Sequence, residues 1–229
     1  MVDVLPRVLH AAKHHPDMTV IGSKIPAWAR AMIELLGIPS LITSSVVRSP
    51  QVLLADHTHP TPHPLDIAML RQAGRRITED VDPPPPRDRV FVTRSTSTRT
   101  MQAGEAADRR ADELGFEVFV PSAYHEYRSQ VAAFCAARTI IGAHGAGLVN
   151  MVFAQPGADV VEIVPDPSPL TGDSRALAER LANAPLFRHL AIAAGHNYHR
   201  EVIPTTVETP FGSASDVITI LERHTELSA

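Results

Sequence analysis

The sequence predicts an α/β protein whose strands are mostly parallel. Short apolar runs rich in valine and isoleucine alternate with longer segments whose apolar residues recur at helical spacing. With 229 residues, 44% of them hydrophobic, the chain is long enough for one large domain or two small ones. We expect two domains.

The amino-terminal part combines strand-like and helix-like segments. Its expected strands lie near residues 18–22, 40–44 and 51–55, and its expected helices near residues 26–36 and 64–76. The strands are short apolar runs, whereas the helices carry apolar residues on one face. This alternation makes the amino-terminal part a small α/β unit.

Four consecutive prolines, Pro83–Pro86, follow this unit. Proline cannot continue a helix or a central strand, and a proline run favours an extended, stiff connection. We therefore expect a linker over residues 83–89. It would separate an amino-terminal domain over 1–82 from a carboxyl-terminal domain over 90–229.

A repeating strand–helix unit follows the linker. Its expected strands cover 89–94, 116–121, 139–142 and 158–165, and its expected helices cover 101–115, 127–138, 146–154 and 173–183, with an amphipathic helix near the carboxyl terminus. Gly115 marks one helix end, after a face made of Ala107, Ala111 and Leu114. In such a sheet the crossovers are right-handed and a ligand lies beyond the carboxyl ends of the strands.

The composition argues against two classes of protein. A formal net charge of -4, without a run of like charges, lacks the basic surface that nucleic-acid binding requires, so we expect no nucleic-acid partner. No apolar stretch approaches the roughly 18 residues that span a bilayer, and the first residues lack the apolar centre of a secretory signal. We expect no transmembrane segment and a cytoplasmic location, either free or peripheral to the membrane.

The single cysteine, Cys135, cannot form an internal disulfide. It shares a helical face with Val131 and Phe134, which favours a small buried apolar residue. A catalytic thiol is the alternative.

The segment IIGAHGAGLVN, residues 140–150, places three glycines and a histidine between a predicted strand and a predicted helix. There, unpaired N–H groups and the helix dipole favour an anion, and glycine lets a ligand approach the backbone closely. We expect a diphosphate at this turn, although the spacing matches neither the dinucleotide-binding nor the P-loop pattern. Two alternatives stay open: a glycine turn without a ligand, and a His144 ring that braces the turn.

Three charged residues belong to the same predicted edge of the sheet. Arg94 follows a strand and Arg99 lies in the same loop, so both guanidinium groups can reach a phosphate. Their alternative is a pair of solvated surface arginines. Glu162 interrupts a strand that should be buried, so it must have a partner or lie at the ligand edge. It either accepts the hydroxyls of a ribose or forms a buried ion pair with an arginine.

The segment LLADHTHPTPH supplies candidates for a general base. Asp56 and His57 follow a predicted strand of the first domain, together with His59. These residues and His63 also carry enough oxygen and nitrogen ligands for zinc or manganese, but the interspersed prolines make the run an irregular loop. A plain polar loop is the remaining interpretation, and we expect no metal site.

The segments FVTRSTSTRT, residues 91–100, and ADELGFEVFVPSAYHEYRSQVAAFCAARTIIGAHGAGLVNMVFAQPGADVVEIVP, residues 111–165, resemble the core of glycosyltransferase family 61. The combination of HGAGL-N with F-x-x-PG is its most specific part. The family includes bacterial capsular and lipopolysaccharide enzymes and eukaryotic N-acetylglucosaminyl- and xylosyltransferases. The resemblance implies two facing Rossmann-like domains of GT-B type, the amino-terminal one short or incomplete, with the nucleotide sugar in the carboxyl-terminal one.

The activity implied is that of an inverting hexosyl- or pentosyltransferase. It would move a sugar from a nucleotide-diphosphate donor such as a UDP-sugar to a glycan or other hydroxyl acceptor, in polysaccharide biosynthesis, without a metal or other cofactor. The expected donor-binding residues are Arg94, Arg99, Gln130, Gly142, His144, Gly145, Ala146, Gly147, Asn150 and Glu162. The expected catalytic residues are Asp56, His57 and His144.

Two other function classes remain open. A catalytically inactive nucleotide-sugar-binding member is favoured by the short first domain and by Ala103 or Gly104 in place of the asparagine usual in the family; Ser129 also replaces a glutamate. An α/β-hydrolase, suggested by the HGAG string, is disfavoured because the chain contains no G-x-S-x-G segment.

Overall fold

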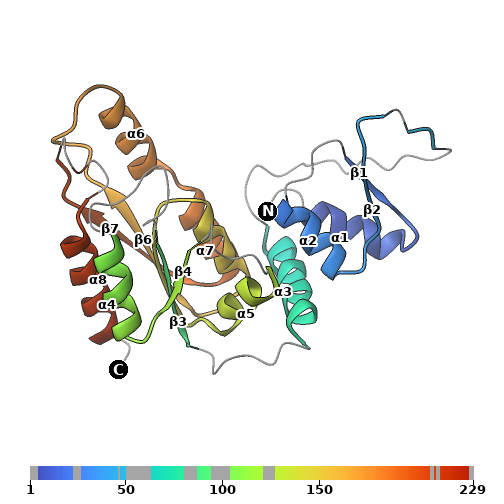
Figure 1. The fold of residues 1–229 in the computed structure, drawn as a ribbon, viewed down its shortest axis with the longest axis horizontal. Helices are drawn as coiled ribbons and strands as arrows, with labels where there is room; N and C mark the ends of the chain where they lie inside the picture. Colours follow the sequence, from blue (N-terminus) through green and yellow to red (C-terminus); the bar gives the residue numbers. More distant parts are fainter. Residues whose placement is uncertain are drawn as a thin grey trace.

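The computed structural model describes residues 5–22, 27–45, 47–49, 63–79, 87–93, 104–120, 127–206, 209 and 212–226. Its main feature is a five-stranded sheet (Figure 1). The strands, in the order in which they lie side by side, are β4 (Glu117–Phe119), β3 (Arg89–Val92), β5 (Thr139–Ala143), β6 (Asp159–Pro165) and β7 (Asn197–Ile203). Each strand is parallel to its neighbours, which confirms the predicted α/β class.

Helices cover both faces of this sheet (Figure 1). One face carries α4 (Gly104–Glu113) and α8 (Ala214–Glu226), and the other carries α5 (Tyr127–Ala136), α7 (Leu186–Ala194) and the 3-10 helix η1 (Ala146–Phe153). α6 (Gly172–Asn183) follows β6. Helices on both faces explain why the central strands are apolar almost without interruption.

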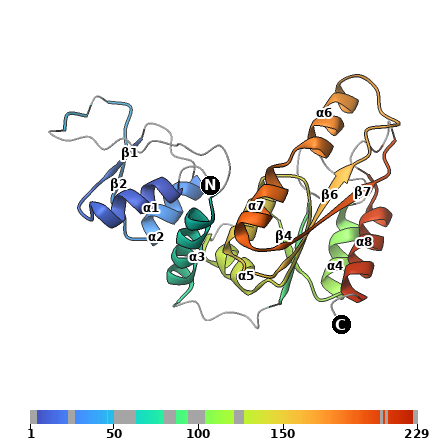
Figure 2. The same ribbon diagram turned by 180° about the vertical axis from the view of Figure 1, so that it is seen from behind.

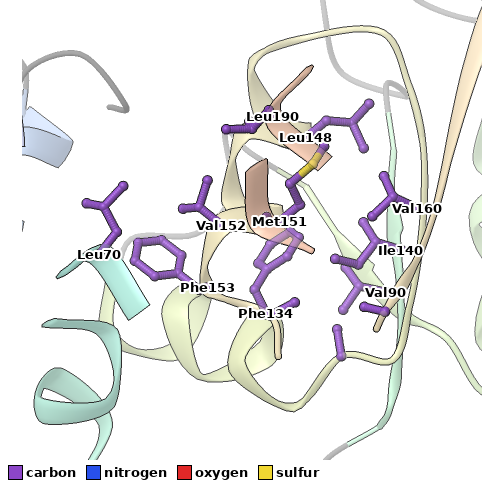
Figure 3. Close-up of a cluster of buried hydrophobic side chains, with 14 of the residues drawn as sticks. Leu70, Val90, Phe134, Ile140, Leu148, Met151, Val152, Phe153, Val160 and Leu190 are labelled. Atoms are coloured by element: carbon purple, nitrogen blue, oxygen red, sulfur yellow. The ribbon is translucent and has the colours of Figure 1, made fainter. Parts of the chain in front are cut away.

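Two buried clusters fill the space between the sheet and its helices. Successive side chains of a strand point to opposite faces. Phe91 and Ile141 therefore pack under α4 and α8, whereas Val90, Ile140 and Val160 pack under α5 and η1. Figure 3 shows the second cluster, in which the apolar residues of η1 lie between the sheet and the neighbouring helices.

The order of the strands creates a switch point in the sheet. β4 lies on one side of β3, while β5, β6 and β7 follow on the other side. A doubly wound sheet of this order has its topological switch point between β3 and β5, and ligands of such sheets bind beyond the carboxyl ends of the strands there. At this end Val92 of β3 lies opposite Gly142 of β5. The glycine turn therefore begins at the place where the fold favours a ligand.

The amino-terminal part contains a second, two-stranded sheet. Its elements are α1 (Leu5–His14), β1 (Val20–Gly22), α2 (Ala27–Leu35), β2 (Ser40–Ile42) and α3 (Pro64–Thr78). β1 and β2 pair in parallel. The strands predicted near 18–22 and 40–44 and both predicted helices are confirmed, whereas the strand predicted near 51–55 lies outside the described residues.

α3 joins the two parts of the chain. It lies beside α5 in both views (Figures 1 and 2), and Leu70 of α3 belongs to the same buried cluster as Phe153 of η1. Arg71 adds a polar connection, since its Nε donates to the carbonyl oxygen of Ala154 at 2.6 Å and its guanidinium also donates to the carbonyl oxygen of Ala194. Part of the predicted linker lies outside the described residues, so the domain division and the GT-B arrangement stay predictions.

Three elements were not anticipated: α1, α7 and β7. α7 ends at Ala194 and is followed by Gly195, whose φ of 72° lies in the left-handed region. The segment after Gly195 was not predicted to form a strand. β7 carries His199, Arg200 and Glu201 in succession, so it lacks the apolar run of a buried strand.

The helix expected over 146–154 is a 3-10 helix. Its ends are closed by bonds between residues three apart, from the N–H of Leu148 to the carbonyl of Gly145 and from the N–H of Ala154 to the carbonyl of Met151. Gly147 and two β-branched valines weaken the preference for an α-helix in this segment. The periodicity predicted a helix and missed its type.

Candidate functional site

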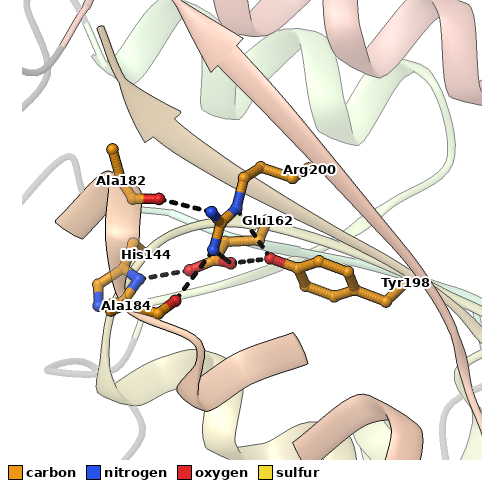
Figure 4. Close-up of polar contacts among 6 residues, drawn as sticks. All are labelled: His144, Glu162, Ala182, Ala184, Tyr198 and Arg200. Atoms are coloured by element: carbon orange, nitrogen blue, oxygen red, sulfur yellow. Dashed lines mark hydrogen bonds and ion pairs between the residues drawn. The ribbon is translucent and has the colours of Figure 1, made fainter. Parts of the chain in front are cut away.

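The site is built from three adjacent strands near the carboxyl end of β5. His144 directly follows β5, Glu162 lies within β6, and Tyr198 and Arg200 lie within β7. Glu162 and Arg200 are register partners, so their side chains lie on the same face of the sheet. Figure 4 shows the side chains of His144, Tyr198 and Arg200 converging on the carboxylate of Glu162.

Glu162 is completely buried, with 0% of its side chain exposed. One carboxylate oxygen, Oε1, contacts Nδ1 of His144, and the other, Oε2, accepts from the Tyr198 hydroxyl and lies 3.4 Å from Nη2 of Arg200. Of the two interpretations of this residue, the buried ion pair with an arginine is therefore present. A contact between this carboxylate and a ribose would require these partners to move.

His144 and Arg200 both reach the surface: 13% of the His144 side chain and 30% of the Arg200 side chain are exposed. The backbone N–H of His144 donates to the carbonyl of Ile163 at 2.9 Å, and the edge of its ring meets the ring of Phe187, with 4.9 Å between centroids. An ionised carboxylate only accepts hydrogen bonds, so the contact with Glu162 places the hydrogen on Nδ1. Nε2, on the far side of the ring from Glu162, is then the accepting nitrogen (Figure 4).

Tyr198 and Arg200 complete the surroundings of the carboxylate. Burial and then the hydrogen bond to Glu162 raise the pKa of Tyr198 to about 12, so the phenol stays a hydrogen-bond donor at neutral pH. Burial opposes the charge of Arg200, but the hydrogen bond to Tyr198 and the charge of Glu162 outweigh burial and raise the pKa of the guanidinium. Glu162 therefore faces a fixed cation and a fixed hydroxyl.

On its inner side, the glycine turn packs closely against β3 and η1. Gly142 lies inside β5 and is buried, and a Cβ there would come within 2.7 Å of Cβ of Val92 and 3.2 Å of Leu148. Glycine is thus required for the close approach of β5, β3 and η1. Gly145 and Gly147 are half-buried, and Ala146 is exposed at the start of η1, so this side of the turn faces outward.

A hydrogen-bonded chain joins three of the predicted residues. Nε2 of Gln130 on α5 donates to Oδ1 of Asn150 at 3.0 Å, and Nδ2 of Asn150 donates to the carbonyl of Gly147 at 3.0 Å. Asn150 is buried. The structure therefore brings Gln130, Asn150 and Gly147 together as a brace between α5 and the turn, and their contacts with a donor stay predictions.

Four of the predicted residues, Asp56, His57, Arg94 and Arg99, lie outside the described residues. Thr93, which directly precedes Arg94, is buried at the end of β3. His63 caps α3, since its Nδ1 accepts from the N–H of Leu65 at 3.2 Å. Within the described part of the chain, histidine, cysteine, aspartate and glutamate side chains form no group of three that could hold a metal ion.

The sequence profile of the family described as Glycosyltransferase 61 matches residues 1–161. The chain belongs to glycosyltransferase family 61. The match extends over α1 to β5 and η1 and into β6, so it confirms the resemblance found in the sequence.

A curated member of similar sequence is the Beta-1,2-xylosyltransferase XAX1 of Oryza sativa subsp. japonica. It is 34% identical to this chain over an alignment of 117 residues, which covers 47% of this chain and 21% of the rice protein. The chain therefore spans about a fifth of the length of this relative. No helix among the described residues is both long enough and apolar enough to cross a membrane.

The family 61 match ends just before Glu162, so the residues that surround this carboxylate come partly from a segment beyond it. Sequence reasoning identified Glu162 and His144 and missed Tyr198, Arg200 and Phe187. Tyr198 and Arg200 lie in a segment whose polar residues His199, Arg200 and Glu201 follow one another, so it gave no strand signal. No local signal pointed to Phe187.

Proposed function

We propose that this protein is an inverting glycosyltransferase that moves a sugar from a nucleotide-diphosphate donor to a hydroxyl group of a glycan or other acceptor. The observation that carries the proposal is the His144–Glu162 pair at the carboxyl end of β5, in a chain of glycosyltransferase family 61. A histidine held through one ring nitrogen by a buried carboxylate is an established arrangement for a general base.

In the proposed reaction, the acceptor hydroxyl oxygen attacks the anomeric carbon of the donor. The hydroxyl proton passes to Nε2 of His144 while Nδ1 stays bonded to Glu162. The bond between the anomeric carbon and the β-phosphate oxygen breaks, and its electron pair leaves with the nucleoside diphosphate. Attack on the face opposite the leaving group inverts the configuration. Asp56 and His57 are the second candidates for accepting the proton.

Negative charge grows on the leaving diphosphate during this step. The main-chain N–H groups at the start of η1, at Gly145, Ala146 and Gly147, are suited to stabilise it, as are Arg94 and Arg99. Fixed dipoles and guanidinium groups of this kind contribute a large part of catalysis and need no metal. Glu162 acts through His144 in this proposal, because its carboxylate oxygens already have partners within the chain.

A pentose is the first donor sugar to test, because the rice relative is named a xylosyltransferase. The full chain is screened by thermal shift against nucleotide-diphosphate sugars, beginning with UDP-xylose, since a bound donor raises the melting temperature. Donors that bind are then incubated with hydroxyl acceptors, and release of nucleoside diphosphate is measured with and without acceptor.

His144→Ala tests the assigned residue. We expect turnover to fall by about tenfold or more with the fold intact, because a positioned general base contributes on the order of a hundredfold. His189→Ala, an exposed histidine of α7, is the control. Unchanged kinetics in folded His144→Ala would remove this residue from the reaction. Donor binding without transfer or hydrolysis would identify an inactive nucleotide-sugar-binding member.

A further inference from the structure

We propose that Tyr198 and Arg200 are positioning residues that hold the His144 ring in its reactive orientation through Glu162. The inference rests on the proposed function and extends the site to β7, a strand beyond the residues matched by the family profile. Neither residue touches the reacting atoms in this proposal. Their effect passes through one buried carboxylate (Figure 4).

Groups on β7 compensate the negative charge of Glu162. A carboxylate with no exposed surface is costly unless other groups replace the water that it has lost. On β7 the Tyr198 hydroxyl donates to Oε2, and Nη2 of Arg200 lies 3.4 Å from the same oxygen. These groups replace hydrogen bonds that water would otherwise give to the carboxylate.

The contacts from β7 also set the orientation of the Glu162 carboxylate. Because Tyr198 and Arg200 both engage Oε2, the other oxygen, Oε1, is turned toward Nδ1 of His144. Oε1 therefore receives the Nδ1 hydrogen, and Nε2 becomes the nitrogen that can take a proton. Loss of the contacts at Oε2 would let the carboxylate rotate and release the ring.

Hydrogen bonds to the end of α6 and to Tyr198 hold the Arg200 guanidinium in place. Its Nε donates to the Tyr198 oxygen at 3.1 Å, Nη2 donates to the carbonyl of Ala184 at 2.9 Å, and Nη1 donates to the carbonyl of Ala182. Both carbonyls lie at the carboxyl end of α6. The planar guanidinium is thus tied to a helix end and to its own strand, which a lysine ammonium cannot reproduce. The helix end therefore helps to fix the histidine.

Two variants test the proposal. Tyr198→Phe removes only the hydroxyl and keeps the ion pair between Arg200 and Glu162, so it is the variant expected to fold best. Arg200→Lys keeps the charge and removes the planar fork. The control is Glu201→Gln, on the opposite face of β7, where Glu201 binds Nη1 of Arg223 at 3.0 Å and does not contact Glu162.

The first readout needs no substrate. Long-range proton–nitrogen NMR distinguishes a ring protonated at Nδ1 from one protonated at Nε2, and the His144 signals are assigned by their loss in His144→Gln. We expect wild type and Glu201→Gln to show the Nδ1-protonated form. Tyr198→Phe and Arg200→Lys should shift the population toward the other form. Ring signals identical to wild type in both variants would overturn the proposal.

The second readout is turnover, measured on variants that unfold at temperatures close to that of wild type. We expect about a tenfold to hundredfold loss for Tyr198→Phe and Arg200→Lys, by analogy with the loss when hydrogen-bond partners of metal-bound histidines are removed. The loss should lie mainly in kcat, because the donor contacts remain. If the wild-type protein were inactive with every donor, the proposed function would be contradicted. The positioning of His144 would still be tested, because the NMR spectra need no substrate.

Discussion

Glu162→Gln tests the arrangement at the centre of the site, because it changes one charge and almost no volume. An amide has one accepting oxygen and one donating nitrogen, whereas the carboxylate accepts on both sides. If the amide oxygen faces Tyr198 and Arg200, the NH2 group faces Nδ1 of His144. Nδ1 must then accept a hydrogen bond, so the ring hydrogen has to lie on Nε2. If the oxygen faces His144, the NH2 group faces the Arg200 guanidinium.

Each arrangement has a different cost. With the amide oxygen toward Tyr198 and Arg200, the hydrogen bonds are kept but Arg200 loses its counter-ion. The ring hydrogen of His144 moves to Nε2, so this nitrogen can no longer accept a proton. The second arrangement leaves donors facing each other with no exposed surface at residue 162 to admit water. We expect the free energy of unfolding to fall by about 1–3 kcal/mol, the range for an unsatisfied buried polar group. Turnover should fall further, by about a hundredfold or more, because a wrongly protonated histidine cannot act as the base.

Urea unfolding followed by circular dichroism measures the first quantity, and nucleoside diphosphate release measures the second. Glu179→Gln is the control, because Glu179 is 46% exposed and pairs with Arg175 on the surface of α6. We expect this control to change stability by less than about 0.5 kcal/mol. Wild-type turnover in a folded Glu162→Gln protein would refute the reasoning, since the carboxylate would then have no part in orienting His144.

Three further predictions concern the surroundings of the site. Gly142→Ala should lower the free energy of unfolding by about 1–3 kcal/mol in urea titrations, because the new Cβ would lie 2.7 Å from Cβ of Val92. Burial, followed by the charge of Arg71, lowers the pKa of His196 despite its bond to Met151, so the unfolded chain binds the proton first. Stability should therefore fall as pH drops below about 6.5, and less so in His196→Gln; equal pH profiles would contradict this. Burial raises the pKa of Cys135 to about 11, so a disulfide reagent at neutral pH should react faster with the urea-unfolded chain than with the folded one.

Four of the five strands of the large sheet were predictable because each of them carries a signal in its own sequence. β3, β5 and β6 are buried on both faces, so their segments are apolar almost without interruption. β7 lies at the edge of the sheet and exposes most of its side chains, so its polar sequence resembles a loop. The strand that completes the site was therefore the one without a local signal.

The candidate site was predictable to a similar extent. The turn stands out because three glycines and His144 lie together between two apolar runs, and Glu162 stands out because it interrupts an apolar run. The type of partner for Glu162 stayed open between a ribose and an arginine. The chain itself supplies Tyr198, 36 residues away, and Arg200, 38 residues away. No local pattern spans such a separation.

Three properties can be predicted from the amino-acid sequence alone: the alternation of strands and helices, the family, and a carboxylate within a strand expected to be buried. These properties are local, because hydrophobic periodicity and motif spacing are written into each segment separately. The groups that surround that carboxylate become apparent only in the assembled fold. β6 lies between β5 and β7 only once the whole sheet has assembled, so the contacts of Glu162 with His144 and Arg200 result from the packing of all layers together.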